Sequence, residues 1–177
     1  DEALLFQLNR CVEHALATHP GDVLVFLPGQ REIGDGERLL AGVDARLVPL
    51  HGELSLDRQN EALNPDAEGR RRVVLATNVA ESSVTLPGVR VVIDAGLARE
   101  PRFDPNSGFS RLETVAISQA SADQRAGRAG RVAEGWCYRL WPQSQRLDPM
   151  RTPEIAQTEL TALRLELAAW GSSDLRF

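Results

Sequence analysis

The segment from residue 124 to residue 131 carries the clearest chemical signal in this sequence. It reads Gln-Arg-Ala-Gly-Arg-Ala-Gly-Arg, so Gln124, Arg128 and Arg131 follow at spacings of four and three residues. On a helix such spacings place side chains on one face. The alanines and glycines between them leave room for a ligand to approach. Because guanidinium groups pair well with phosphate oxygens, the segment predicts stabilisation of a transferring phosphoryl group.

Three solvated surface arginines are the structural alternative for this segment. Each glycine inside a helix costs about 1 kcal/mol relative to alanine, so the segment sacrifices helix stability. A repeated Arg-Ala-Gly pattern that accepts this loss favours the chemical interpretation. In this chain by itself, we expect Arg128 and Arg131 to point to water.

A second polar segment follows the apolar run 73–76. Its hydroxyl and amide side chains are Thr77, Asn78, Ser82, Ser83 and Thr85. Open α/β sheets place ligands at the ends of their strands, and such groups hold the phosphates of a nucleic-acid strand. An ordinary polar loop with a helix cap accounts for the composition equally well.

A third segment, Pro28-Gly29-Gln30, follows the apolar run 23–27. It leads into a predicted helix, and the N-terminus of a helix binds phosphate readily. Plain turn chemistry is the alternative. Taken together, the three segments place polar groups after two buried strands and around one arginine-rich helix.

The composition is that of a globular protein, with 42% hydrophobic and 25% charged residues. No apolar run approaches the roughly 18 residues of a membrane span. Two cysteines are too few for a disulfide framework, which favours buried thiols in a reducing cytosol. The three histidines have no neighbouring thiol or carboxylate at metal-ligand spacing, so we predict no metal site.

The net charge of −5 argues against a nucleic-acid partner, since such proteins usually carry a basic surface. The charge is unevenly distributed, because arginines gather between residues 70 and 131 while the first 68 residues are rich in acids. All 20 strong cations are arginine, which suits phosphate recognition. The charge therefore weakens the nucleic-acid interpretation without excluding it.

Apolar runs alternate with segments of helical periodicity over most of the chain. Strands are predicted at 23–27, 46–50, 73–76, 89–93 and 135–140. Helices are predicted at 3–17, 31–41, 55–63 with Ser55 as its cap, 121–130 with Ser121 as its cap, and 153–170. The alternation predicts an α/β fold with a mainly parallel sheet. Residues 97–117 surround an Asp-Pro-Asn-Ser-Gly turn and predict an inserted β-hairpin.

The three polar segments, in this order, resemble motifs IV, V and VI of superfamily 2 helicases. Motif VI has the same eight residues as in the DEAH-box RNA helicases, and the stretches 26–33, 102–105 and 165–171 resemble their bacterial HrpB type. The resemblance covers nearly the whole chain. It implies a RecA-like fold of the P-loop NTPase type, with three α/β/α layers. Residues 1–142 would be the second RecA-like domain, and 143–177 a connector with the first helix of a helical, winged-helix region.

The resemblance also implies roles on the nucleotide side. Gln124, Arg128 and Arg131 would be the catalytic residues, facing the ATP phosphates and the attacking water, with the two arginines as fingers. Ser83 would sense the nucleotide state, and Thr85 would lie near the ribose. DEAH-box proteins usually carry aspartate where this chain has Pro87. Because proline cannot accept a hydrogen bond from a ribose hydroxyl through its side chain, we expect weak discrimination between nucleotides.

On the nucleic-acid side, the resemblance implies contacts with RNA. Those in motifs IV and V would come from Gly29, Gln30, Thr77 and Asn78. The hairpin would correspond to the strand-separating hairpin of the family and would contribute Arg102 and Arg111.

Two family signatures are missing from this chain. It has neither the Gly-Lys-Ser/Thr phosphate loop nor an Asp-Glu-x-His motif. ATP and Mg²⁺ would therefore be held mainly by a first RecA-like domain of the full-length protein, and we expect this chain alone to be inactive. Two other functions stay open: a non-catalytic RNA-binding or partner-docking module, and a DNA translocase. A phosphate loop upstream would favour the enzyme over the module, and strand-preference assays would separate RNA from DNA.

Overall fold

The computed structural model describes residues 2–82, 84–104, 106–131, 133–150 and 161–170. The chain forms two compact units, a larger one of residues 1–99 and 114–151 and a smaller one of residues 100–113 and 152–177. Our predicted domain boundary between residues 142 and 143 remains a prediction.

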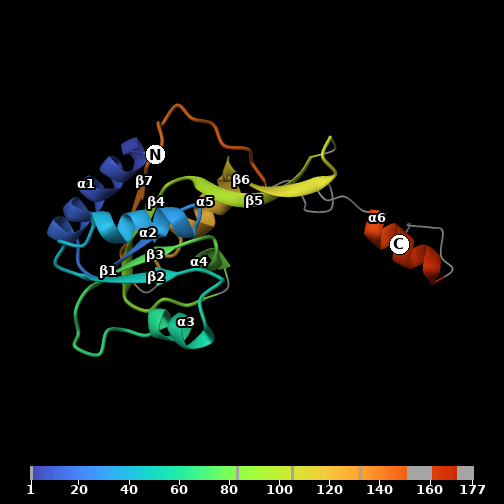
Figure 1. Ribbon diagram of the computed structural model, residues 1–177. Helices are drawn as coiled ribbons and strands as arrows, with labels where there is room; N and C mark the ends of the chain where they lie inside the picture. The colour runs from blue at the N-terminus through green and yellow to red at the C-terminus, as the bar shows by residue number, and fades with distance from the viewer. Residues whose placement is uncertain (1, 83, 105, 132, 151–160, 171–177) are drawn as a thin grey trace. The chain divides into compact units, whose positions relative to one another are not determined.

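A five-stranded sheet forms the centre of the larger unit (Figure 1). Its strands, in spatial order, are β2 (Arg46–Leu50), β3 (Arg72–Ala76), β1 (Asp22–Phe26), β4 (Val89–Asp94) and β7 (Trp136–Arg139). Every neighbouring pair runs parallel. The α/β fold with a mainly parallel sheet is therefore confirmed.

Helices cover both faces of this sheet, with α1 and α2 on one side and α3 on the other (Figure 1). Their bounds are α1 (Glu2–Thr18), α2 (Gln30–Leu39), α3 (Leu56–Leu63), α4 (Val79–Ser82) and α5 (Gln119–Ala126). In β1, Val23 and Val25 pack in the core under α1 and α2, whereas Leu24 and Phe26 pack in the core that includes α3 and α4. Because successive strand residues face opposite sides, one apolar run supplies both cores.

The carboxyl ends of the strands lie in register along one edge of the sheet. The Leu27 N–H donates to the carbonyl of Ala76 at 2.8 Å, and the Thr77 N–H donates to the carbonyl of Leu50 at 3.1 Å. The ladder thus continues one residue past β1 and β3. It fixes the starting points of the segments that carry Gly29 and Thr77.

A buried arginine joins the strands at the opposite edge. Arg72 donates from Nε to the Asp22 carboxylate at 2.8 Å and from its backbone N–H to the same carboxylate at 2.8 Å. Its Nη atoms donate to the carbonyls of Ala62 at 3.0 Å and Pro87 at 2.9 Å. Gly88 has a φ of 91°, and a Cβ there would lie 3.0 Å from the Asp22 carboxylate. One guanidinium therefore ties together β1, β3, α3 and the turn before β4.

Two helix boundaries test the predicted caps. Ser55 caps α3 as predicted, accepting from the Arg58 N–H at 3.4 Å. The cap predicted at Ser121 is wrong, because Ser118 accepts from the Ser121 N–H at 3.2 Å and α5 starts at Gln119. The helix also ends early, at Ala126 rather than at residue 130, and the next backbone bonds run from residues 128 and 129 to residues 125 and 126. This tighter i to i+3 pattern is common where an α-helix ends.

The predicted hairpin is confirmed as a separate two-stranded sheet of β5 (Leu97–Asp104) and β6 (Phe109–Ala116). The Gly108 N–H donates to the carbonyl of Asp104 at 2.9 Å, so the turn between the strands lies where the sequence predicts it. The last helix, α6, is described over Thr161–Ala169, and its predicted start at residue 153 lies outside the described residues.

The thiols and the helix lengths test two predictions made from composition. Both cysteines are free thiols, but Cys11 is half-buried and Cys137 is exposed, so the prediction that both are buried is wrong. Strand β7 lies at the edge of the sheet, which leaves Cys137 uncovered.

Within the part of the chain that is described, no helix is long and apolar enough to span a membrane.

The Arg72 network leads to a prediction for stability. Replacing Arg72 with Met leaves the Asp22 carboxylate without its buried partner, so we expect the free energy of unfolding to fall by about 3–5 kcal/mol. Arg38, whose side chain is 79% exposed and pairs with Asp35, provides the matched control. Arg38→Met should change stability by less than about 1 kcal/mol. Urea unfolding of this chain measures both, and equal effects would contradict the role given to Arg72.

Candidate nucleotide and RNA interface

The segment after β1 brings an arginine against Gly29. Gly29 is buried, while Gln30 is exposed as the first residue of α2. A Cβ on Gly29 would lie 2.9 Å from Nε of Arg99 and 3.1 Å from Oε2 of Glu32. Glycine therefore permits Arg99 to lie on the backbone next to the predicted RNA contacts. Arg99 belongs to none of the sequence motifs, and its tight approach to Gly29 emerges only from the fold.

The segment after β3 folds at once into the short helix α4. The carbonyl of Thr77 accepts from the Ala80 N–H at 3.2 Å, and the carbonyl of Asn78 accepts from the Glu81 N–H at 3.0 Å. Thr77 is half-buried and Asn78 is exposed. The two predicted RNA-contacting residues thus form the first turn leading into α4, at the carboxyl edge of the sheet.

Arg125 joins this segment to α5 from inside the protein. Its side chain is fully buried, and Nε donates to the Glu81 carboxylate at 3.0 Å while Nη1 donates to Asp94 at 2.8 Å. The guanidinium carbon lies 4.8 Å from the ring centroid of Phe26. Burial raises the pKa of Asp94, and the charge of Arg125 opposes this effect. None of Glu81, Asp94 and Arg125 was assigned a role from the sequence.

Arg128 is also held within the protein. Its Nε donates to the carbonyl of Glu81 at 3.0 Å and Nη1 donates to the carbonyl of Val84 at 2.7 Å, with Nη2 also bonded to Glu81. Arg128 is only 8% exposed, and burial lowers its pKa, with a further contribution from Arg131. The expectation that Arg128 points to water is wrong. The carbonyl groups of Glu81 and Val84 face it and accept from all three of its side-chain nitrogens.

Gln124 and Arg131 are both exposed. Gln124 lies on α5, but α5 ends at Ala126, so Arg128 and Arg131 lie beyond the helix. The prediction that all three share one helical face is therefore wrong. Their contacts with a nucleotide stay a prediction, with Arg131 the one of the two arginines that is open to solvent.

Three further positions, Ser83, Thr85 and Pro87, were considered for contact with the nucleotide. Thr85 is exposed, and Ser83 lies outside the described residues. Pro87 is exposed, but its carbonyl accepts the hydrogen bond from Arg72. At position 87, a carbonyl oxygen is thus already used within the fold.

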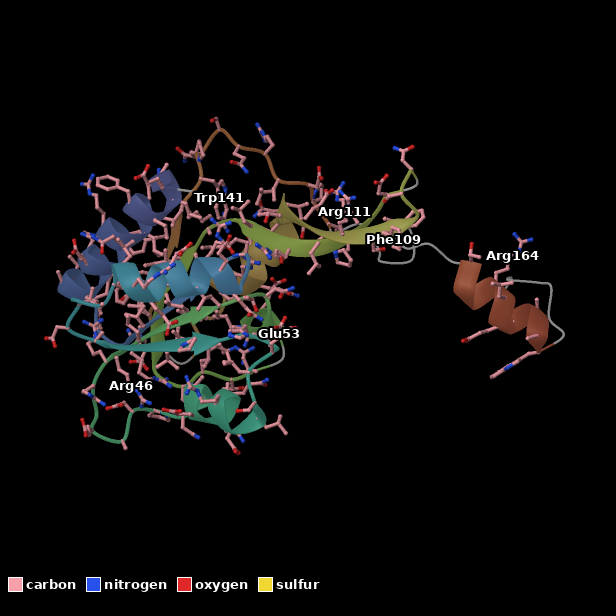
Figure 2. The ribbon with its side chains drawn as sticks, viewed as in Figure 1. Arg46, Glu53, Phe109, Arg111, Trp141 and Arg164 are labelled. Carbon is pink, nitrogen blue, oxygen red and sulfur yellow. The ribbon has the colours of Figure 1, made fainter. Side chains whose placement is uncertain are left out.

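The hairpin carries cations and apolar side chains together. Arg102 and Arg111 are both exposed, and Nε of Arg102 lies 3.9 Å from the Glu113 carboxylate. Phe109 is 72% exposed, and Figure 2 shows Phe109 and Arg111 on the same hairpin. Exposed arginines beside an exposed ring have the chemistry of a surface that binds phosphate and stacks bases.

A cavity of about 560 Å³ lies elsewhere, between α1 and the end of β7, and is lined by Arg10, Tyr138 and Trp141 among others. It includes none of the predicted site residues. Within the described ranges, no three His, Cys, Asp or Glu side chains gather as ligands for a metal ion.

Comparison with known proteins assigns this chain to a family. A model of the helicase conserved C-terminal domain matches residues 7–133. ATP-dependent RNA helicase HrpB of Escherichia coli K12 is 46% identical over 164 residues, which is 90% of this chain and 20% of that protein. ATP-dependent RNA helicase HrpA of the same organism is 42% identical, over 88% of this chain and 12% of that protein. The probable ATP-dependent RNA helicase DHX34 of Mus musculus is also 42% identical, over 88% of this chain and 14% of that protein.

A solved structure agrees with this result. The crystal structure of the Escherichia coli DEAH/RHA helicase HrpB is similar with a TM-score of 0.87 and 44% sequence identity, covering 94% of this chain and 22% of that one. The chain thus spans only about a fifth or less of the length of these relatives.

Proposed function

Because this chain belongs to the helicase conserved C-terminal domain family, we propose that it is the second RecA-like domain of an ATP-dependent RNA helicase of the DEAH-box type. The observation that carries the proposal is that two guanidinium groups, those of Arg125 and Arg128, join the segment after β3 to the segment 124–131. The segment after β3 suits contact with an RNA backbone, and the segment 124–131 suits contact with the phosphates of a nucleotide. Joined in this way, they suit a motor that links RNA contact to nucleotide hydrolysis.

On the nucleotide side, Gln124 and Arg131 present donors to solvent, and Thr85 is exposed on the segment after α4. These exposed residues could contact a triphosphate that is bound to another domain. The ATP, with its Mg²⁺, would be held mainly by the first RecA-like domain of the full-length protein. The residues of the present chain, Gln124 and Arg131, would orient the γ-phosphate and neutralise the charge that develops during its transfer.

On the RNA side, Gly29, Gln30, Thr77 and Asn78 lie at the carboxyl edge of the sheet, and Arg99 joins them through its approach to Gly29. Backbone N–H groups and short polar side chains bind phosphates without reading sequence. This set would form half of a groove for single-stranded RNA, and Arg102 and Arg111 would extend RNA binding on the hairpin.

The two arginines of segment 124–131 are expected to differ when replaced in the full-length protein. Arg131→Ala should lower kcat for ATP hydrolysis by about 10³-fold or more, the size of an arginine-finger effect, because Arg131 is open to solvent and can reach phosphate. Its melting temperature and RNA affinity should stay close to those of the wild type. Arg128→Ala should reduce hydrolysis and also stability, since it removes the bonds to Glu81 and Val84.

Arg146, an exposed arginine of the segment after β7, provides the control for this experiment. Arg146→Ala should leave hydrolysis unchanged. Steady-state ATPase assays and thermal melts measure the three variants. Normal turnover by Arg131→Ala would show that the finger assignment is wrong.

This chain by itself should bind ATP weakly, with a Kd above about 1 mM, because the groups that cradle the triphosphate are expected in another domain. It should also show no ATP hydrolysis. Isothermal titration of ATP into the chain measures the affinity, and the full-length protein serves as the positive control. A micromolar Kd for the chain alone would mean that its nucleotide site is complete.

The hairpin arginines should contribute to RNA affinity through charge. Replacing both Arg102 and Arg111 with Ala should reduce the slope of log K against log salt for single-stranded RNA by about 1.4, or roughly 0.7 for each lost phosphate contact. Fluorescence anisotropy at several salt concentrations measures this in the full-length protein. Arg38→Ala, at an exposed position of α2, should leave the slope unchanged. An unchanged slope in the double variant would remove the hairpin from the RNA interface.

A further inference from the structure

Glu81 lies in the short helix α4 and belongs to the segment after β3. Its backbone N–H donates to the carbonyl of Asn78 at 3.0 Å. Asn78 and Thr77 are the predicted RNA contacts, so Glu81 is bonded directly to the backbone that would follow an RNA strand. Any change in the conformation of that turn reaches Glu81 through a single hydrogen bond.

The other polar groups of Glu81 all bond to side chains of α5 or of the residues just after it. Its carboxylate accepts from Nε of Arg125 at 3.0 Å through Oε2 and from the Ser121 hydroxyl through Oε1. Its backbone carbonyl accepts from Nε of Arg128 at 3.0 Å and from Nη2. One residue is therefore bonded to side chains from the first turn of α5, from its last turn and from beyond its end.

The partners of Glu81 make this connection rigid. Arg125 is fully buried and bonded on its other side to Asp94 of β4, so breaking its bond to Glu81 would leave a buried charge without one of its partners. Such an arrangement strongly resists separation. Because Arg128 is bonded to the backbone carbonyls of Glu81 and Val84, a displacement of this part of the chain can carry Arg128 and the residues after it along.

We propose that Glu81 is a positioning residue that couples RNA binding at Thr77 and Asn78 to the placement of Arg128 and Arg131. The inference rests on the proposed function of these two segments. RNA contact shifts the turn before α4, Glu81 carries the shift to Arg125 and Arg128, and the chain around Arg131 is repositioned toward the γ-phosphate. RNA thereby stimulates ATP hydrolysis through a residue that touches neither ligand.

The test measures how strongly RNA stimulates hydrolysis in the full-length protein. Glu81→Gln keeps the size of the side chain but loses the charge that pairs with Arg125. The ratio of kcat with saturating RNA to kcat without RNA should fall by at least about 5-fold, the lower end of coupling between two sites. The RNA concentration giving half-maximal stimulation should change less than about 3-fold, because Thr77 and Asn78 are untouched.

A second pair of variants keeps the test decisive if Glu81→Gln does not fold. Ser121→Ala removes only the hydroxyl that bonds Glu81, and it should lower the ratio in the same direction by a smaller factor. Ser121→Thr keeps a hydroxyl at that position and should restore the ratio. Glu134→Gln, at an exposed glutamate, is the control and should leave the ratio unchanged.

The outcomes separate this inference from the proposed function. If Arg131→Ala hydrolyses ATP normally, or if RNA does not stimulate the wild type, the proposed function itself is contradicted and the coupling inference is overturned with it. If Arg131→Ala is inactive while Glu81→Gln and Ser121→Ala keep the wild-type ratio, only the coupling inference is wrong. A lower melting temperature with an unchanged ratio also overturns the coupling alone, since it assigns Glu81 a purely structural role.

Discussion

Arg125 carries a positive charge into the interior of the domain, and the arrangement of the candidate site depends on how that charge is compensated. A buried guanidinium is tolerated only when carboxylates and carbonyls surround it. Here Asp94 comes from β4 and Glu81 from α4, while Arg125 itself belongs to α5. One side chain thus fixes α5 to α4 and β4, which precede Arg125 by 44 and 31 residues at the bonded positions. The positions of the segments on either side of Arg125 depend on these contacts.

The neighbours of Arg125 show how identical side chains acquire different properties from their surroundings. Arg128 lies three residues further on and is bonded to backbone carbonyls, whereas Arg131 is exposed. Burial lowers the pKa of Arg128, although an arginine stays charged in any protein environment. An arginine anchored on carbonyls stabilises the chain around it, and an arginine in solvent is available to a ligand. The arginine-rich segment therefore combines an internal anchor with an open contact.

Much of the fold was predictable because each central strand is a continuous apolar run, as at residues 23–27, and burial on both faces leaves no other pattern. The start of α5 was not, because Ser118 and Ser121 are equally good caps by residue type and only the tertiary contact of Ser121 with Glu81 separates them. The candidate site likewise has parts that were predictable from the sequence and parts that were not. The polar segments were visible as motifs, but the Glu81–Arg125 pair joins residues 44 apart, and no local pattern encodes it.

The net charge of −5 is a poor predictor of whether this surface can bind a polyanion. The buried pairs Arg72–Asp22 and Arg125–Asp94 each cancel, so they leave the net charge of the remaining groups at −5. What matters to a polyanion is how the exposed charges are distributed. A nucleic-acid strand responds to the exposed groups nearest its phosphates, because charges separated by more than about 10 Å are screened by salt. The RNA recognition that we propose at the carboxyl edge would therefore depend on backbone N–H groups, on Asn78 and on the exposed arginines, and an overall acidic composition is compatible with it.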